Sequence, residues 1–170
     1  HQLFLTEDDL LGFDSNCHVL PPLRTTADRA ALRAAVARGD IEAVCSDHQP
    51  HDEDAKLAPF PATQPGISAL ETLLPLTLAL VAEGAMGLSD AIARLTAGPA
   101  RILGLPVGNL GVGMTADVCV FDPHARWVVS TASLLSQGAN TPFLGRELAG
   151  RTTWTLVSGR IVFEQNHEVP

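Results

Sequence analysis

The stretch Ile41-Glu-Ala-Val-Cys-Ser-Asp-His-Gln-Pro-His51 contains the signal on which the fold class depends. Its first half, residues 41–46, is short, partly β-branched and bounded by polar residues, which predicts a buried strand. Its second half opens a dense polar cluster that continues to Asp54. In parallel α/β proteins the carboxyl ends of strands carry the chemistry. The stretch therefore predicts an α/β fold with a functional site directly after this strand.

Helical signals lie on both sides of this stretch. Upstream, Thr26 is a suitable N-cap and Gly39 a natural stop, with apolar residues at helical spacing between them. The expected helices downstream cover 68–83, with a kink at Pro75, then 89–96 and 99–103. A helix followed at once by a buried strand and then by further helices is an α/β pattern.

After Gly104 the helical period disappears, and glycine and β-branched residues dominate. The expected strands cover 117–121, 126–129, 152–157 and 160–163. The pair Ser158-Gly159 between the last two is a two-residue hairpin signal. We therefore expect an α/β unit over residues 1–104 and a smaller β unit, with a C-terminal tail, over residues 105–170.

Composition limits the class of protein. The 170 residues include 11 Lys and Arg against 19 Asp and Glu, a net charge of −8, with 46% apolar residues. This is a globular composition without a basic stripe, so we expect no nucleic-acid partner. The longest apolar run, Leu73 to Ala82, is too short to span a bilayer. Three cysteines without a C-x-x-C pair predict reduced, buried thiols in a cytoplasmic protein.

The most informative side chains are those of Asp47 and His51, which lie four residues apart just past the expected strand. Carboxylate oxygen and imidazole nitrogen are both zinc ligands, and a carboxylate at a strand end can also act as a general base. A solvated polar loop that happens to contain two histidines explains the same residues equally well. The adjacent His48 is expected to point away and to play a supporting role.

These residues resemble the dihydroorotases, cyclic amidohydrolases of the amidohydrolase superfamily. The stretch Ser46-Asp-His-Gln-Pro-His51 is similar to the T-D-H-A-P-H signature of that family. Three other stretches agree in order and spacing: His1-Gln-Leu-Phe-Leu-Thr6 with P-H-H-L-x-L-T, Pro21-Pro-Leu-Arg24 with N-P-P-L-R, and Pro65-Gly-Ile-Ser-Ala-Leu-Glu71 with P-x-G-I-x-G-L-E-T. The segments 98–105, 113–117 and 140–143 are typical of the end of such chains. The resemblance covers nearly all 170 residues and maps them to the last two-fifths of a full-length enzyme.

The resemblance implies a fold and a site. The fold is the C-terminal part of a (β/α)₈ TIM-like metal-dependent hydrolase barrel, plus a small β-sandwich subdomain. His1 and Asp47 match metal ligands, and Asp47 is also the catalytic proton shuttle. His51, Pro65 and Gly66 match residues that bind substrate. The implied cofactor is one or two Zn²⁺ ions, whose remaining ligands, an H-x-H motif among them, come from upstream of this chain.

The implied reaction is the reversible cyclisation of N-carbamoyl-L-aspartate to dihydroorotate in pyrimidine synthesis. The implied partners are this small-molecule substrate, the N-terminal part of the same protein, and either a second copy or an aspartate carbamoyltransferase. One departure is plain: Leu20 stands where the family has a substrate-binding Asn, although His18 could supply a substitute contact. Two alternatives stay open, a non-catalytic dihydroorotase-like subunit of a carbamoyltransferase complex and a related hydantoinase or allantoinase.

Overall fold

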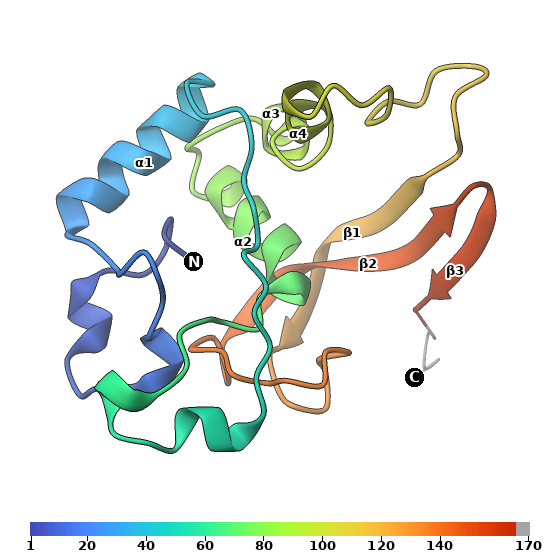
Figure 1. Ribbon diagram of the computed structural model, residues 1–170. Coiled ribbons are helices and arrows are strands. Elements are labelled where there is room, and N and C mark those ends of the chain that lie inside the picture. Colours follow the sequence, from blue (N-terminus) through green and yellow to red (C-terminus); the bar gives the residue numbers. More distant parts are fainter. Residues whose placement is uncertain (166–170) are drawn as a thin grey trace.

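The computed structural model describes residues 1–165, so the last part of the expected tail, residues 166–170, lies outside the described residues. The fold is a mixed α/β arrangement in which helices occupy one side and a small sheet the other (Figure 1). The helices are α1 (Thr26–Arg38), α2 (Leu70–Ala82), α3 (Leu88–Ala93) and α4 (Ala97–Ile102). Short 3-10 turns are η1 (Glu7–Leu10), η2 (Ser15–Cys17), η3 (Glu53–Lys56) and η4 (Phe60–Ala62). The strands are β1 (Val118–Val128), β2 (Glu147–Val157) and β3 (Arg160–Glu164).

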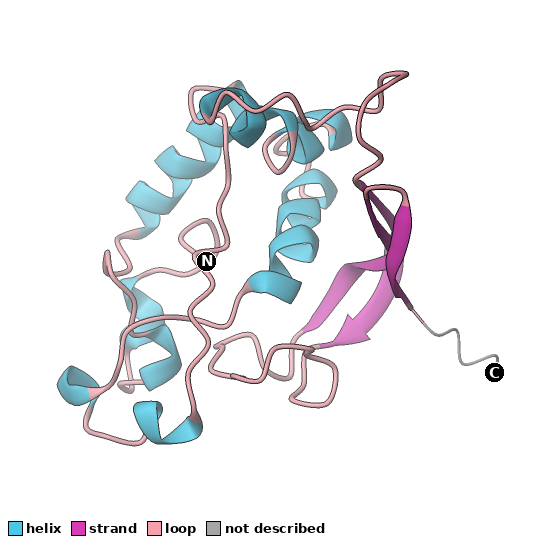
Figure 2. Ribbon diagram, turned by 45° about the vertical axis from the view of Figure 1, so that its right-hand side comes forward, coloured by secondary structure: helices cyan, strands magenta, loops and turns pink. Residues whose placement is uncertain are grey.

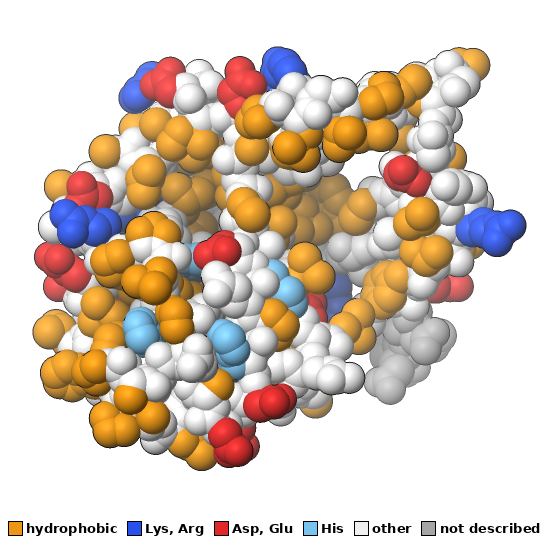
Figure 3. Space-filling view, in the orientation of Figure 1, with side chains coloured by type: hydrophobic (Ala, Val, Ile, Leu, Met, Phe, Trp, Pro, Cys, Tyr) orange, Lys and Arg blue, Asp and Glu red, His pale blue; other side chains and the backbone are white. Residues whose placement is uncertain are grey.

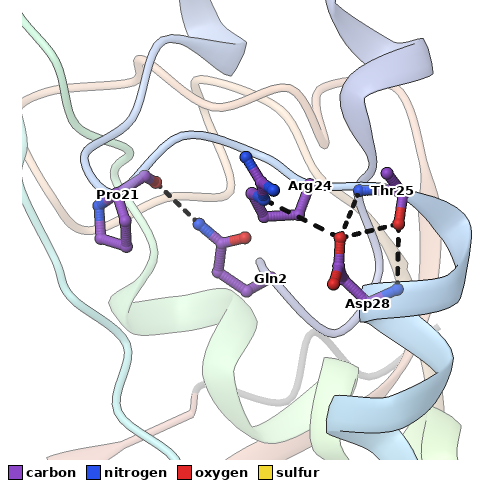
Figure 4. Close-up of polar contacts among 5 residues, drawn as sticks. All are labelled: Gln2, Pro21, Arg24, Thr25 and Asp28. Carbon is purple, nitrogen blue, oxygen red and sulfur yellow. Dashed lines mark hydrogen bonds and ion pairs between the residues drawn. The ribbon is translucent and has the colours of Figure 1, made fainter.

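Helix α1 begins with a capping box one residue earlier than the sequence predicts. Thr25, not Thr26, is the N-cap, because its hydroxyl accepts from the Asp28 amide at 3.1 Å while its own amide donates to the Asp28 carboxylate at 3.1 Å (Figure 4). The helix ends at Gly39, whose φ of 90° is left-handed. Both ends of α1 are therefore determined by local sequence.

The sheet is antiparallel, in the order β1-β2-β3. The two strands expected at 117–121 and 126–129 are one strand, β1, whose register shifts between Asp122 and Arg126. Pro123 lies in that shift, where a residue without an amide hydrogen interrupts the ladder. The predicted hairpin is confirmed: Ser158 and Gly159 have φ of 50° and 77°, the signs that a type I′ turn requires.

The predicted buried strand at residues 41–46 is wrong. This segment forms no ladder, is only partly buried, and leaves Cys45 exposed. A backbone bond tethers it to the helical region, from the Val44 amide to the Arg94 carbonyl at 3.0 Å. A strand needs a neighbouring strand to satisfy its backbone groups, and the described residues place none beside this segment.

Helix α2 lies between the two sides of the molecule and packs against β2, as Figures 1 and 2 show. The main core cluster includes Leu5, Ile67, Trp127, Val129 and Phe143. The indole Nε1 of Trp127 donates to the Gly150 carbonyl at 3.1 Å. One core thus joins the first residues, the segment before α2 and the sheet. Whether residues 1–104 and 105–170 are separate units remains a prediction.

Two further findings concern expectations from composition. The three cysteines are free thiols, but only Cys17 is buried, whereas Cys45 and Cys119 are exposed. Burial raises the pKa of the Cys17 thiol to about 11, and the Asp14 carboxylate adds to the shift. Within residues 1–165, no helix is both long and apolar enough to cross a membrane.

Candidate active site

The polar cluster after residue 46 is a loop with unusual backbone geometry. Asp47 has φ of 47°, a left-handed conformation that costs a non-glycine residue about 1 kcal/mol. Its amide donates to the Cys45 sulfur at 3.4 Å, and the residue is exposed. Strained backbone of this kind concentrates at functional sites, where surrounding contacts hold it in place.

His48 supplies one of those contacts. Its Nδ1 accepts the backbone amides of Ala69 at 3.0 Å and Leu70 at 3.1 Å. An alanine at the N-cap position offers no side-chain acceptor, so a histidine 21 residues upstream caps helix α2. Because Nδ1 is the acceptor, the neutral ring carries its proton on Nε2. We expected a supporting role for His48, and the cap on α2 is a contact of that kind. The sequence alone does not indicate a helix cap.

The same loop pairs with the segment that precedes α2. His48 forms a parallel bridge with Ile67, and the Gln49 amide donates to the Ile67 carbonyl at 2.9 Å. His51 Nε2 donates to the Pro65 carbonyl at 2.9 Å, since a carbonyl only accepts, and this leaves Nδ1 for another partner. The structure therefore brings the three predicted substrate-binding residues, His51, Pro65 and Gly66, into one group.

Gly66 is in a position that only glycine fits. Its φ is 129°, and a Cβ there would lie 2.5 Å from the Gln49 Cβ and 3.1 Å from His51 Nε2. Its amide donates to the His18 carbonyl at 2.8 Å. Close packing of the Gln49 and His51 side chains against the Gly66 backbone, rather than turn formation alone, explains this glycine.

His1, the predicted metal ligand, lies toward Asp47. The Asp47 carboxylate is close enough to this residue to act on its backbone nitrogen electrostatically. The Nδ1 atom of His1 is buried, with no hydrogen-bond partner in the described part of the chain. His1 also borders a small cavity of about 20 Å³, together with Val44 and Cys45.

A buried imidazole nitrogen without a hydrogen-bond partner is a donor that zinc accepts, and the carboxylate oxygen of Asp47 is another. Across residues 1–165, no group of three or more His, Cys, Asp or Glu side chains is arranged to hold a metal ion. Within the described residues, His1 and Asp47 therefore supply only part of the ligand set that a metal centre needs.

Sequence reasoning missed two residues that hold this site together. The ammonium group of Lys56 donates to three backbone carbonyls, of Ser15 at 3.2 Å, Gln64 at 2.6 Å and Gly66 at 2.9 Å. Burial lowers the pKa of Lys56. The second is Asn140, from the segment between β1 and β2, whose carboxamide contacts the backbone of Gln49, His51 and Gly66. Only the motif Asn140-Thr-Pro-Phe143 hinted at a special position, without indicating a role.

His18, two residues before Leu20, already has a hydrogen-bond partner. Thr63 donates its hydroxyl proton to the Phe60 carbonyl at 2.8 Å, so His18 Nδ1 must donate to the Thr63 oxygen, at 2.7 Å. The His18 ring also lies 4.8 Å from the Phe60 ring, centroid to centroid. Only Nε2 of His18 is left for a substitute contact. Leu20 itself is 62% exposed.

One side-chain contact ties this region to the start of the chain. Gln2 Nε2 donates to the Pro21 carbonyl at 2.9 Å, which joins the first residues to the segment that leads into α1 (Figure 4). Several histidine side chains also reach the surface on one face of the molecule, among apolar neighbours (Figure 3). The site is thus an open face of loops held by backbone contacts.

The chain belongs to the amidohydrolase family, which matches it over residues 14–162. It is 51% identical over 164 residues to a dihydroorotase-like protein of Pseudomonas aeruginosa, covering 96% of this chain and 38% of the relative. It is 47% identical over 163 residues to a dihydroorotase of Syntrophotalea carbinolica, again covering 96% of this chain and 38% of the relative.

Among solved structures, an L-hydantoinase (dihydropyrimidinase) from Arthrobacter aurescens superposes with a TM-score of 0.88 at 28% identity. The match covers 98% of this chain and 38% of that one. The chain therefore spans about two-fifths of the length of the proteins it matches.

Proposed function

We propose that this chain is the C-terminal part of a zinc-dependent dihydroorotase that interconverts N-carbamoyl-L-aspartate and dihydroorotate. The single observation that carries the proposal is the pairing of the loop after Asp47 with residues 65–67, which brings together the residues that the family motifs assign to substrate. Family membership and relatives named dihydroorotase support the same reaction. A position within a larger barrel and sandwich is supported by the length match and by the apolar side chains exposed at the end of α4 and beyond it: Ile102, Leu103, Leu105, Leu110 and Val112.

His1 and Asp47 would hold the metal, which supplies a Lewis acid and activates water near neutral pH. In the hydrolytic direction water adds to the cyclic amide carbonyl carbon, and the bond from that carbon to the ring nitrogen breaks. The Asp47 carboxylate takes the proton from the water and delivers it to the leaving nitrogen. His51, whose Nε2 donates to the Pro65 carbonyl, offers Nδ1 to the substrate.

The test is turnover of carbamoyl-aspartate and dihydroorotate by the whole enzyme, with and without a zinc chelator. Asp47→Asn keeps the side-chain volume but removes the base, so we expect kcat to fall at least about 100-fold. Unchanged turnover in Asp47→Asn would rule out the proton-shuttle role. Zinc that restores the chelated wild type but not the variant would support it.

A second candidate is a non-catalytic dihydroorotase-like subunit of an aspartate carbamoyltransferase complex. Leu20, whose side chain cannot form a hydrogen bond, favours it, and the Pseudomonas aeruginosa relative is likewise named dihydroorotase-like. Metal analysis of the whole protein, together with co-purification with the carbamoyltransferase, separates the two. Absence of zinc and of turnover in a stable complex would establish the structural role.

A third candidate, a hydantoinase or allantoinase, is favoured by the superposition on the Arthrobacter aurescens hydantoinase. The three reactions open related cyclic amides, but only dihydroorotate carries a ring carboxylate among the usual substrates of these enzymes. Parallel assays with dihydroorotate, a 5-substituted hydantoin and allantoin decide between them by comparing kcat/KM.

A further inference from the structure

Asn140 connects the strand-rich end of the chain to the candidate substrate site. Its Oδ1 accepts the His51 amide at 2.8 Å, and its Nδ2 donates to the Gln49 and Gly66 carbonyls, each at 3.0 Å. Its own carbonyl accepts the Ser68 amide at 2.9 Å. One buried side chain therefore bonds to both loops that the family motifs assign to substrate.

The orientation of this carboxamide follows from its partners. Two of them are carbonyls, which only accept, and one is an amide, which only donates. A flipped amide would place oxygen against two oxygens and nitrogen against an N–H. Asn140 is 6% exposed, so water cannot replace these bonds. All three bonds are thus required by the fold around this residue.

The neighbouring backbone is pressed against the same loop. A Cβ at Gly138 would lie 2.6 Å from the His51 nitrogen and 2.8 Å from the His51 oxygen. The next residues along the chain are buried as well, with Thr141 1% and Phe143 0% exposed. The segment around Asn140 is therefore a fixed support, against which the loop after Asp47 rests.

We infer that Asn140 is a positioning residue for substrate binding: it sets the spacing between His51 and Gly66 without touching the substrate itself. The inference rests on the proposed function for its kinetic readout. Without the carboxamide, the His51 amide and the Gln49 carbonyl lose this partner and the Gly66 carbonyl keeps only Lys56, so the two loops can separate more easily. Since His51 and Gly66 face substrate in the proposal, separation weakens binding more than it slows the chemical step.

The same segment offers a matched control. Glu71, on α2, accepts the amides of Leu135 and Ser136 at 2.8 and 2.7 Å and the Ser136 hydroxyl at 2.8 Å. Glu71→Gln loosens the segment at this second attachment and leaves the contacts of Asn140 in place. Asn140→Ala removes the carboxamide, and Asn140→Asp keeps the acceptor for His51 while removing both donors.

The experiment uses the whole enzyme and two readouts. The first is steady-state kinetics with dihydroorotate, where we expect KM to rise about tenfold in both Asn140 variants, with kcat within about threefold of wild type. Glu71→Gln is expected to leave KM within about twofold. The second is backbone hydrogen exchange of peptides covering 48–52 and 64–69, where protection should fall at least tenfold in Asn140→Ala but not in Glu71→Gln.

An unchanged KM in a folded Asn140→Ala enzyme would overturn the inference, as would unchanged exchange in both peptides. A merely structural residue would lower the active fraction, and so kcat, without moving KM. If the wild type turns over no cyclic amide, the proposed function fails. The exchange measurement then decides the positioning role by itself, because it needs no substrate.

Discussion

Replacing Gly66 with alanine tests the close approach of the two site loops. At φ of 129° a non-glycine residue costs on the order of 1–3 kcal/mol. The new Cβ would lie 2.5 Å from the Gln49 Cβ, about 1 Å nearer than ordinary van der Waals contact, and overpacking of this kind costs about 1–3 kcal/mol more. We expect Gly66→Ala to destabilise the whole enzyme by about 3 kcal/mol and to raise KM, since the displaced loop carries His51.

A matched variant separates backbone strain from contact. Gly84 also has a left-handed φ, 74°, but a Cβ there would meet nothing within 4 Å. Gly84→Ala should therefore cost only about 1 kcal/mol and leave KM unchanged. Chemical denaturation and steady-state kinetics of both variants measure the difference. Equal stability losses, or an unchanged KM in Gly66→Ala, would refute the argument that contact between the loops determines this position.

Two predictions concern other contacts of the site region. Burial raises the pKa of Glu71, but hydrogen bonds from Ser136 and Leu135 lower it by more, so the folded pKa lies below the usual value of 4.5. A carboxylate whose pKa is lowered by folding stabilises the folded state at pH values above its usual pKa. We therefore expect wild type to be more stable than Glu71→Gln by about 0.5 kcal/mol at pH 7, allowing for the partial exposure of the group, and the advantage to be lost in a denaturation series as the pH falls below 4.5 and through the lowered pKa of the folded state. His48→Ala should lose about 1 kcal/mol by uncapping α2, and His48→Asn, whose Oδ1 can take the place of Nδ1, should recover most of it; equal loss in both would contradict the cap.

Local signals account for much of what could be predicted. Helix α1 begins and ends within a residue of the expected positions, because its capping box and terminal glycine act within one turn. The hairpin at Ser158-Gly159 is confirmed for the same reason. The family motifs also identified the family, since several stretches in the right order are specific together.

The errors arose where a distant partner decides the structure. Residues 41–46 have the composition of a buried strand but find no strand to pair with among the described residues. Pro123 interrupts the pairing of β1 without ending the strand, because β2 continues on both sides of the shift. Composition suggested buried cysteines, yet Cys45 and Cys119 are exposed.

The sequence by itself determined the family, the turn and cap positions, and which side chains are candidates for chemistry. Only the tertiary structure decided how those side chains are held. The cap on α2 comes from His48, and the loops around His51 and Gly66 are joined by Asn140, up to 91 residues away. Spacing along the chain cannot reveal such contacts, because a buried carbonyl or amide forms its hydrogen bond with whatever partner the fold brings within about 3 Å.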